Sequence, residues 1–221
     1  MRRKILLPEQ IGPLVYKLAE TDQEIEIARR LHHDVYLRVG YIEEPVPSGM
    51  IEDGYHPYSD YVIAILENGR PKRRGEVVGV MRIIKNSELS YPTLNEFMVL
   101  KKVKNWIDSI DQEGIIEVGS LCVKPGYSAA KGLYRYAWQY SKIRRDTLWL
   151  ACIDKTLFEV LKRRYQFYFK KIGREQFYLG SVTVPAMLDC GRQRLLMDSR
   201  LFAFYDKPQV PKSMVNILEL V

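Results

Sequence analysis

The sequence predicts one α/β domain, in which helices flank a central sheet of mixed strand direction. Apolar segments with the period of strands alternate along the chain with amphipathic helical segments. No linker rich in glycine, serine or proline divides the 221 residues, and 47% hydrophobic residues suffice for one sizeable core. A strand, a loop of small residues and a helix follow one another over residues 115–145. We therefore expect residues 1–221 to form a single domain organised around that unit.

The N-terminal part is expected to supply a strand, a helix and a long loop. Residues 1–12 form a basic, loosely held lead, and a strand follows over residues 14–18. Asp22 is the expected N-cap of a helix over residues 23–38 with one apolar stripe. Proline, glycine and aromatic residues recur over residues 39–60, which indicates a long loop. This loop is either a lid over an apolar ligand or a segment packed on the protein's own core.

The rest of the chain continues the alternation. The expected elements are strands over residues 61–66 and 76–84, a short helical region over 93–110, a strand from 115, a helix reaching 145, a strand over 148–153, a helix over 155–164, a strand over 182–185, a last helix over 186–204 and a tail over 205–221. The first two strands form a hairpin. Arg82 lies inside its apolar second strand, so we expect it to pair with a carboxylate or to face a cavity.

The net charge of +7 indicates an acidic partner, which is nucleic acid, an anionic membrane surface or an acidic protein. The basic residues are dispersed and no nucleic-acid motif is present, so a nucleic-acid-binding domain is the weaker alternative.

Cys122, Cys152 and Cys190 lie far apart in apolar segments, which predicts buried, reduced thiols rather than disulfides or a metal site. Neither a signal peptide nor a membrane-spanning run is evident, so we expect a cytoplasmic protein.

The loop after residue 123 has the composition of an anion-binding loop. A helix N-terminus carries unpaired backbone N–H groups and a partial positive charge, and small residues let an anion approach them. The candidate residues are Ser128, Ala129, Ala130, Lys131 and Gly132. The same pattern also occurs in purely structural turns, so the spacing alone does not identify the anion.

Three segments resemble the Gcn5-related N-acetyltransferase (GNAT) fold: residues 117–132, the strand at 148–152, and residues 167–174, which look like the family's "FYxxxGF" ending. Within that fold, residues 28–41, 49–56 and 78–82 are similar to the branch that uses acyl carrier protein. That branch contains the acyl-homoserine-lactone synthases and the long-chain N-acyl amino acid synthases. His32, Tyr41, His56 and Ser120 depart from the lactone synthases, whereas "GSLCV" at 119–123 and residues 182–188 resemble the N-acyl amino acid synthases.

The resemblance implies an enzyme that transfers a long-chain fatty acyl group from acyl carrier protein to the α-amine of an amino acid, with tyrosine expected. The amine attacks directly, without an acyl-enzyme, and the acyl-phosphopantetheine of the carrier serves as donor in place of a bound cofactor. Glu117 receives the proton of the amine, directly or through water. Arg82 holds either Glu117 or the substrate carboxylate. Backbone N–H groups of Leu121, Cys122 and Val123 are the expected oxyanion donors.

The resemblance also places the pocket and the docking surface. The expected pocket residues are Tyr36, Tyr41, Met50, Asp53, Tyr55, Ser120 and Trp138. The expected carrier dock comprises Lys162, Arg163, Arg164, Lys170, Lys171 and Arg174, with Arg70, Lys72, Arg73 and Arg74 as the competing patch. The lipid product suggests peripheral membrane contact. The alternative enzymes are an acetyl-coenzyme A acetyltransferase and a lactone synthase.

Overall fold

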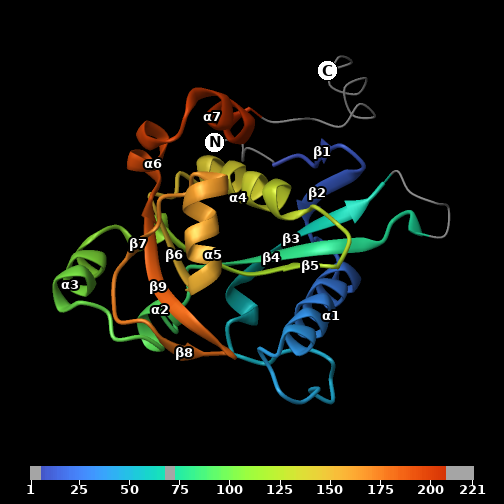
Figure 1. Ribbon diagram of the computed structural model, residues 1–221, viewed down its shortest axis with the longest axis horizontal. Coiled ribbons are helices and arrows are strands. Elements are labelled where there is room, and N and C mark those ends of the chain that lie inside the picture. The colour runs from blue at the N-terminus through green and yellow to red at the C-terminus, as the bar shows by residue number, and fades with distance from the viewer. Residues whose placement is uncertain (1–5, 68–72, 208–221) are drawn as a thin grey trace.

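The computed structural model describes residues 6–67 and 73–207. Their strands form one sheet in the order β1-β2-β3-β4-β5-β6-β9-β7, with β8 paired to β9 (Figure 1). The strands are β1 (Glu9–Ile11), β2 (Leu14–Leu18), β3 (Ser59–Leu66), β4 (Val77–Lys85), β5 (Ile115–Val123), β6 (Leu148–Asp154), β7 (Lys170–Lys171), β8 (Gln176–Tyr178) and β9 (Ser181–Asp189). Strands β5 and β6 run parallel, whereas the other pairs are antiparallel. The predicted mixed α/β class is confirmed.

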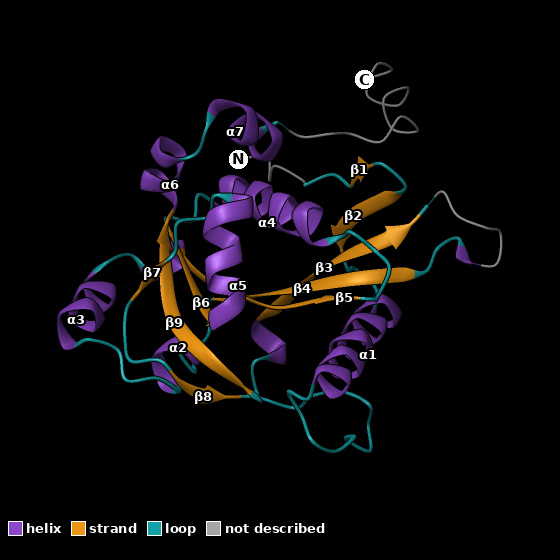
Figure 2. Ribbon diagram, in the orientation of Figure 1, coloured by secondary structure: helices purple, strands orange, loops and turns teal. Residues whose placement is uncertain are grey.

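Helices cover both faces of the sheet (Figure 2). They are α1 (Asp22–Val39), α2 (Pro92–Asn95), α3 (Lys101–Ser109), α4 (Ala130–Arg144), α5 (Lys155–Val160), α6 (Cys190–Leu196) and α7 (Ser199–Asp206), with a π-helical turn η4 (Leu161–Tyr165) after α5. Buried residues of α4 and α7 pack with the sheet in the main core, and α1 packs on the other face of β3, β4 and β5. No helix in the described part of the chain is long and apolar enough to cross a membrane.

Helix α1 begins and ends where its sequence dictates. Thr21, not the predicted Asp22, is the N-cap, because its side chain accepts the Glu24 N–H while Glu24 reaches back to the cap. Ala28 and Leu31 form the buried stripe. Gly40 ends the helix in the left-handed region at φ 77°, where glycine carries no steric penalty. The chain then enters the predicted long loop.

Strands β5 and β6 part in the middle of the sheet. They pair only between Ile115–Glu117 and Leu148–Leu150. On the other side of β5, the register with β4 shifts between Val80 and Arg82. Ser120 lies at this irregularity with φ 48°, which a non-glycine residue seldom adopts. Past Glu117, therefore, β5 has no strand partner on the β6 side.

The C-terminal prediction was wrong in part. Strand β9 runs from Ser181 to Asp189, through the region predicted to begin the last helix, and α6 and α7 follow separately. Pro185 does not end the strand. The nitrogen and the carbonyl of a strand residue point to the same side of the strand, and the Pro185 carbonyl points toward Ile172 near the short β7, away from β6. The missing N–H thus costs no bond to β6.

Both chain ends are more ordered than predicted within the described residues. Glu9, in the expected loose lead, belongs to β1 and forms a buried ion pair with Arg135 of α4 at 2.6 Å. Tyr205, in the expected tail, is fully buried in α7. Residues 1–5 and 208–221 of these two predictions lie outside the described residues.

Candidate active site

Two cavities lie where β5 and β6 part. The larger, which we call the polar cavity, has a volume of about 300 Å³. It is lined by His32, Tyr36, Tyr41, Ile42, Ile51, Glu52, Asp53, Arg82, Ile84, Pro92, Glu117, Gly119, Ser120, Cys152, Asp154, Tyr178, Leu179, Ser181 and Thr183. Helix α1, the loop after it and five strands therefore all contribute to one hollow that contains acids, bases and aromatic rings.

The smaller hollow, which we call the apolar cavity, has a volume of about 110 Å³. It reaches the side of the sheet covered by α4 and α5, where Tyr134, Leu157 and Leu161 line it. The residues shared with the polar cavity are Tyr36, Tyr41, Gly119, Ser120, Cys152 and Asp154. The gap in the sheet is thus bordered by a hollow lined by four acids and an arginine and by a hollow whose one charged lining residue is Asp154.

Glu117 is the last residue of β5 that pairs with β6, and it lines the polar cavity. One carboxylate oxygen accepts the N–H of Thr93 at 2.9 Å, and the other accepts the thiol of Cys152 at 3.6 Å. Burial raises the pKa of Glu117 to about 7, although these two donors and Arg82 oppose the rise. A carboxylate with this pKa can accept and return a proton near neutral pH.

Arg82 meets a carboxylate, as expected, but its partner is Asp53 rather than Glu117. Its two Nη atoms donate to the two oxygens of Asp53, one of them at 2.9 Å, and Nε donates to Ser59 Oγ at 2.7 Å. Although burial opposes it, this pairing holds the pKa of Asp53 below its ordinary value. The ion pair attaches the long loop to β4 and forms one wall of the polar cavity.

His32 is a cavity residue that the sequence prediction left out of the site. It is 6% exposed, and its ring contacts that of Tyr36 edge to face at 4.2 Å between centroids. Burial and the charge of Arg82 lower the pKa of His32 to about 3, so its imidazole is neutral. Its Nε2 has no hydrogen-bond partner among the described residues. The position of His32 beside charged neighbours on α1 was the available signal.

Thr93 was also missed, because its role depends on a contact across the sheet. Pro92 occupies the first position of the short helix α2, where a missing N–H is harmless. The next residue, Thr93, is fully buried and directs its N–H at Glu117. The Tyr-Pro-Thr sequence signals a helix start, but nothing in it identifies the acceptor.

The three predicted oxyanion donors divide into two groups. Lys124 donates its N–H to the Val78 carbonyl at 2.9 Å, and by alternation along the strand Cys122 also directs its N–H toward β4. Cys122 is fully buried, with its side chain in the cluster under α1. The N–H groups of Leu121 and Val123 therefore face the gap, and Cys122 is ruled out as a donor.

The predicted phosphate loop is only partly accessible. Ser128 and Lys131 are exposed, and the Lys131 ammonium lies 4.1 Å from the ring centroid of Phe204. Ala129 is fully buried, and a Cβ on Gly132 would lie 2.1 Å from the ring of Tyr16. The Gly132 position therefore has no room for a side chain, because it packs closely on Tyr16. Ala130 opens α4, whose N-terminus has no side-chain cap.

The structure brings together four of the seven predicted pocket residues, which are Tyr36, Tyr41, Asp53 and Ser120. Met50 and Tyr55 belong to the same loop but do not line either cavity. Trp138 is a core residue, since it is 2% exposed and packs edge to face on Trp149 at 5.8 Å. The helical pattern of α4 could not reveal which of its aromatic residues faces the sheet and which faces the gap.

The six residues of the predicted carrier dock are all exposed. Lys162, Arg163 and Arg164 lie on η4, whereas Lys170 and Lys171 lie on β7. Arg174 follows β7 beside α3, where its N–H bonds the Met98 carbonyl. Of the competing patch, Arg70 and Lys72 lie outside the described residues, and Arg73 and Arg74 are exposed. The dock residues therefore come from η4 and from β7 with the turn after it.

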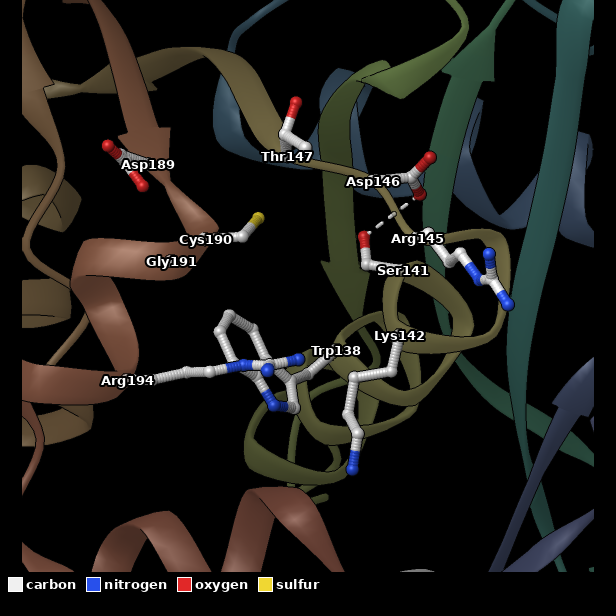
Figure 3. Close-up of a pocket in the computed structure, with 10 residues that line it drawn as sticks. All are labelled: Trp138, Ser141, Lys142, Arg145, Asp146, Thr147, Asp189, Cys190, Gly191 and Arg194. Carbon is white, nitrogen blue, oxygen red and sulfur yellow. Dashed lines mark hydrogen bonds between the residues drawn. The ribbon is translucent and has the colours of Figure 1, made fainter.

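A third cavity of about 420 Å³ lies between the ends of α4 and β9 (Figure 3). Its lining residues are Trp138, Ser141, Lys142, Arg145, Asp146, Thr147, Asp189, Cys190, Gly191 and Arg194. Its acids are already engaged. Asp146 accepts the Ser141 hydroxyl at 3.1 Å, and Asp189 caps α6. It shares no residue with the hollows at the gap, so it is not the reaction site despite its larger volume.

Three solved structures resemble the chain over most of its length. FeeM, an N-acyl amino acid synthase from uncultured soil microbes, has a TM-score of 0.62 and 16% identity, with 86% of this chain and 96% of FeeM covered. LasI, an AHL synthase, has a TM-score of 0.61 and 13% identity, with 90% and 98% covered. BjaI, a CoA-dependent acyl-homoserine lactone synthase, has a TM-score of 0.61 and 18% identity, with 89% and 92% covered. At these identities the likeness establishes the fold.

A family match over most of the chain identifies the class of protein as an acyltransferase. A family model described as N-acyl amino acid synthase FeeM matches residues 27–189. The chain therefore belongs to the FeeM family of N-acyl amino acid synthases. A comparison with curated protein sequences finds no match.

Proposed function

We propose that the protein transfers a long-chain fatty acyl group from the phosphopantetheine thioester of acyl carrier protein to the α-amine of an amino acid, with tyrosine as the preferred acceptor. One observation carries the proposal. Glu117, with a pKa of about 7, lines the polar cavity where β5 and β6 part, and Leu121 farther along the same strand lines the apolar cavity. A proton acceptor and an oxyanion site then flank the same reacting carbonyl.

In the proposed reaction, the amino acid occupies the polar cavity as an ammonium ion. Glu117 removes one proton, and the free amine attacks the thioester carbon, forming the C–N bond. The N–H of Leu121, a residue that lines the apolar cavity at the gap, stabilises the oxyanion of the tetrahedral intermediate. The intermediate then expels the pantetheine thiolate, which takes a proton as the nitrogen loses its second one. Cys152 takes no covalent part, since burial and Glu117 raise its thiol pKa well above the ordinary value.

The carboxylate of the amino acid is assigned to the Arg82 side of the polar cavity. Arg82 has five N–H groups, and three of them serve Ser59 and Asp53. The remaining two are the cationic donors for a substrate carboxylate, while Asp53 keeps the guanidinium in place. Aromatic lining from Tyr178 and Tyr41 suits an aromatic acceptor such as tyrosine.

Two features favour a carrier protein over coenzyme A as donor. The loop before α4 lacks the leading Arg or Gln of the acetyltransferase pattern, so it offers fewer groups to a pyrophosphate, whereas the carrier brings a single phosphodiester. The net charge of +7 and the exposed basic residues of η4 and β7 suit an acidic carrier.

The cysteines of the described chain are free, which agrees with the proposed cytoplasmic setting. Contact with a membrane would come only through the lipid product.

The test supplies the purified protein with tyrosine and a C14 acyl group carried either by acyl carrier protein or by coenzyme A. Acyl-tyrosine is measured by mass spectrometry, and a panel of other amino acids replaces tyrosine in parallel. The proposal expects product from the carrier thioester, with kcat/KM at least tenfold above that with the coenzyme A thioester. Product from acyl- or acetyl-coenzyme A alone would reject the carrier as donor, and a better acceptor than tyrosine would correct the substrate.

A further inference from the structure

The polar and apolar cavities share one wall, and its two large members are tyrosines. Tyr36 and Tyr41 border both hollows, together with the smaller Gly119, Ser120, Cys152 and Asp154. The rings of the two tyrosines meet edge to face at 5.1 Å between centroids. At Gly119 a Cβ atom would meet nothing within 4 Å, so the wall is open at that point. The two tyrosines are therefore the largest side chains that line both hollows.

The end of helix α1 holds these rings in place. Tyr41 donates its backbone N–H to the Tyr36 carbonyl at 2.8 Å, which couples the two residues across the helix C-cap. Gly180 packs directly against this turn, because a Cβ there would lie 2.2 Å from the Gly40 carbonyl oxygen. The hydroxyl of Tyr36 is within hydrogen-bonding reach of Ser120. That of Tyr41 is within reach of Ser181.

The volumes indicate what the wall does to an acyl chain. An apolar cavity of about 150 Å³ accommodates a benzene-sized molecule. The apolar cavity, at about 110 Å³, therefore holds only a short acyl segment as it stands. The remainder of a longer chain must pass the tyrosine wall or stay outside. The polar cavity beyond the wall has about 300 Å³, part of it lined by Ile42, Ile51 and Leu179.

We propose that Tyr36 and Tyr41 form a partition between the acyl chain and the amino acid, and that the bulk of the two rings sets the acyl chain length the enzyme accepts. This inference rests on the proposed function, because it assumes that a fatty thioester reacts at the gap. The rings act by volume rather than by chemistry. Tyr36→Phe keeps that volume, whereas Tyr36→Ala joins the two hollows.

The experiment measures kcat/KM for carrier thioesters from C6 to C16, all with tyrosine as acceptor. The partition predicts that Tyr36→Ala and Tyr41→Ala raise the C16 to C8 ratio by at least about tenfold, the lower end of the discrimination that one methylene group produces in an apolar pocket. Tyr36→Phe keeps the wild-type ratio. The matched control is Tyr55→Ala, which makes the same truncation in the same loop region but outside both hollows. Thermal unfolding of each variant identifies any that fails to fold.

The outcomes separate the partition from the function on which it rests. If wild-type protein acylates tyrosine but both alanine variants keep its chain-length ratio, the partition is rejected and the proposed function stands. A ratio that changes equally in Tyr55→Ala also rejects it, because the effect would then be general loosening. If the wild type forms no acyl amide from any thioester in the series, the proposed function itself fails.

Discussion

Replacing Glu117 with glutamine tests the chemistry and the electrostatics of the site together. Glutamine has nearly the same shape, so its side-chain oxygen can still accept the Thr93 N–H. The variant cannot take a proton from the ammonium group of the substrate. Loss of a positioned general base typically lowers turnover by about 10²- to 10⁴-fold, and we expect kcat to fall within that range.

The stability of the same variant is expected to move in the opposite direction. Burial raises the Glu117 pKa from 4.5 to about 7. The native protein therefore holds a proton that the unfolded chain releases above 4.5, so this group makes the native state less stable as pH rises from 4.5 through about 7, above which its penalty is complete. The pKa difference of about 2.5, at about 1.4 kcal/mol each, corresponds to a penalty of about 3 kcal/mol. The glutamine variant lacks this penalty.

The assay has two parts, each run from pH 5.5 to 9. The wild-type kcat/KM should rise with pH through about 7, since the base works deprotonated, and that rise should be absent from the residual activity of the variant. Urea unfolding should show the variant to be at least as stable as the wild type at pH 8. Glu113→Gln, an exposed residue before β5, is the matched control. Turnover within threefold of wild type, or a variant less stable by several kcal/mol at pH 8, would refute the reasoning.

Three further predictions follow from contacts in the site and core. In Cys152→Ala, Glu117 loses a thiol donor that lowers its pKa, so the rise in kcat/KM should move to higher pH, and an unmoved profile would contradict the contact. In Asp53→Asn, Arg82 loses its charged partner, so the KM for the amino acid should rise about tenfold with a smaller change in kcat. An unchanged KM would show that the Arg82–Asp53 pair takes no part in substrate binding. Trp138→Phe should lower the free energy of unfolding by about 1–3 kcal/mol while leaving kcat/KM intact, because Trp138 packs in the core. A tenfold loss of kcat/KM would show instead that Trp138 contributes to the substrate pocket.

The sequence was informative wherever a local pattern has one meaning. Strand periodicity located β3, β4 and β6, and the small residues after β5 located the start of α4. It was less informative where neighbours decide the outcome. Pro185 marks a strand end by sequence, but it lies inside β9 because its nitrogen faces the short edge strand. Residues 9–11 form β1 by pairing with β2, and Glu9 is held there by Arg135, which is 126 positions away.

For the site, the chain itself determined the types of residue available, an acid in an apolar strand and an arginine in its neighbour. Only the tertiary structure decided that Arg82 pairs with Asp53, that Thr93 and Cys152 hold Glu117, and that Trp138 belongs to the core. The physical reason is that a local segment sets conformation and periodicity, whereas burial and contact between distant segments set the partner and the proton affinity of each charged group. Those two properties make a carboxylate on a strand into a base.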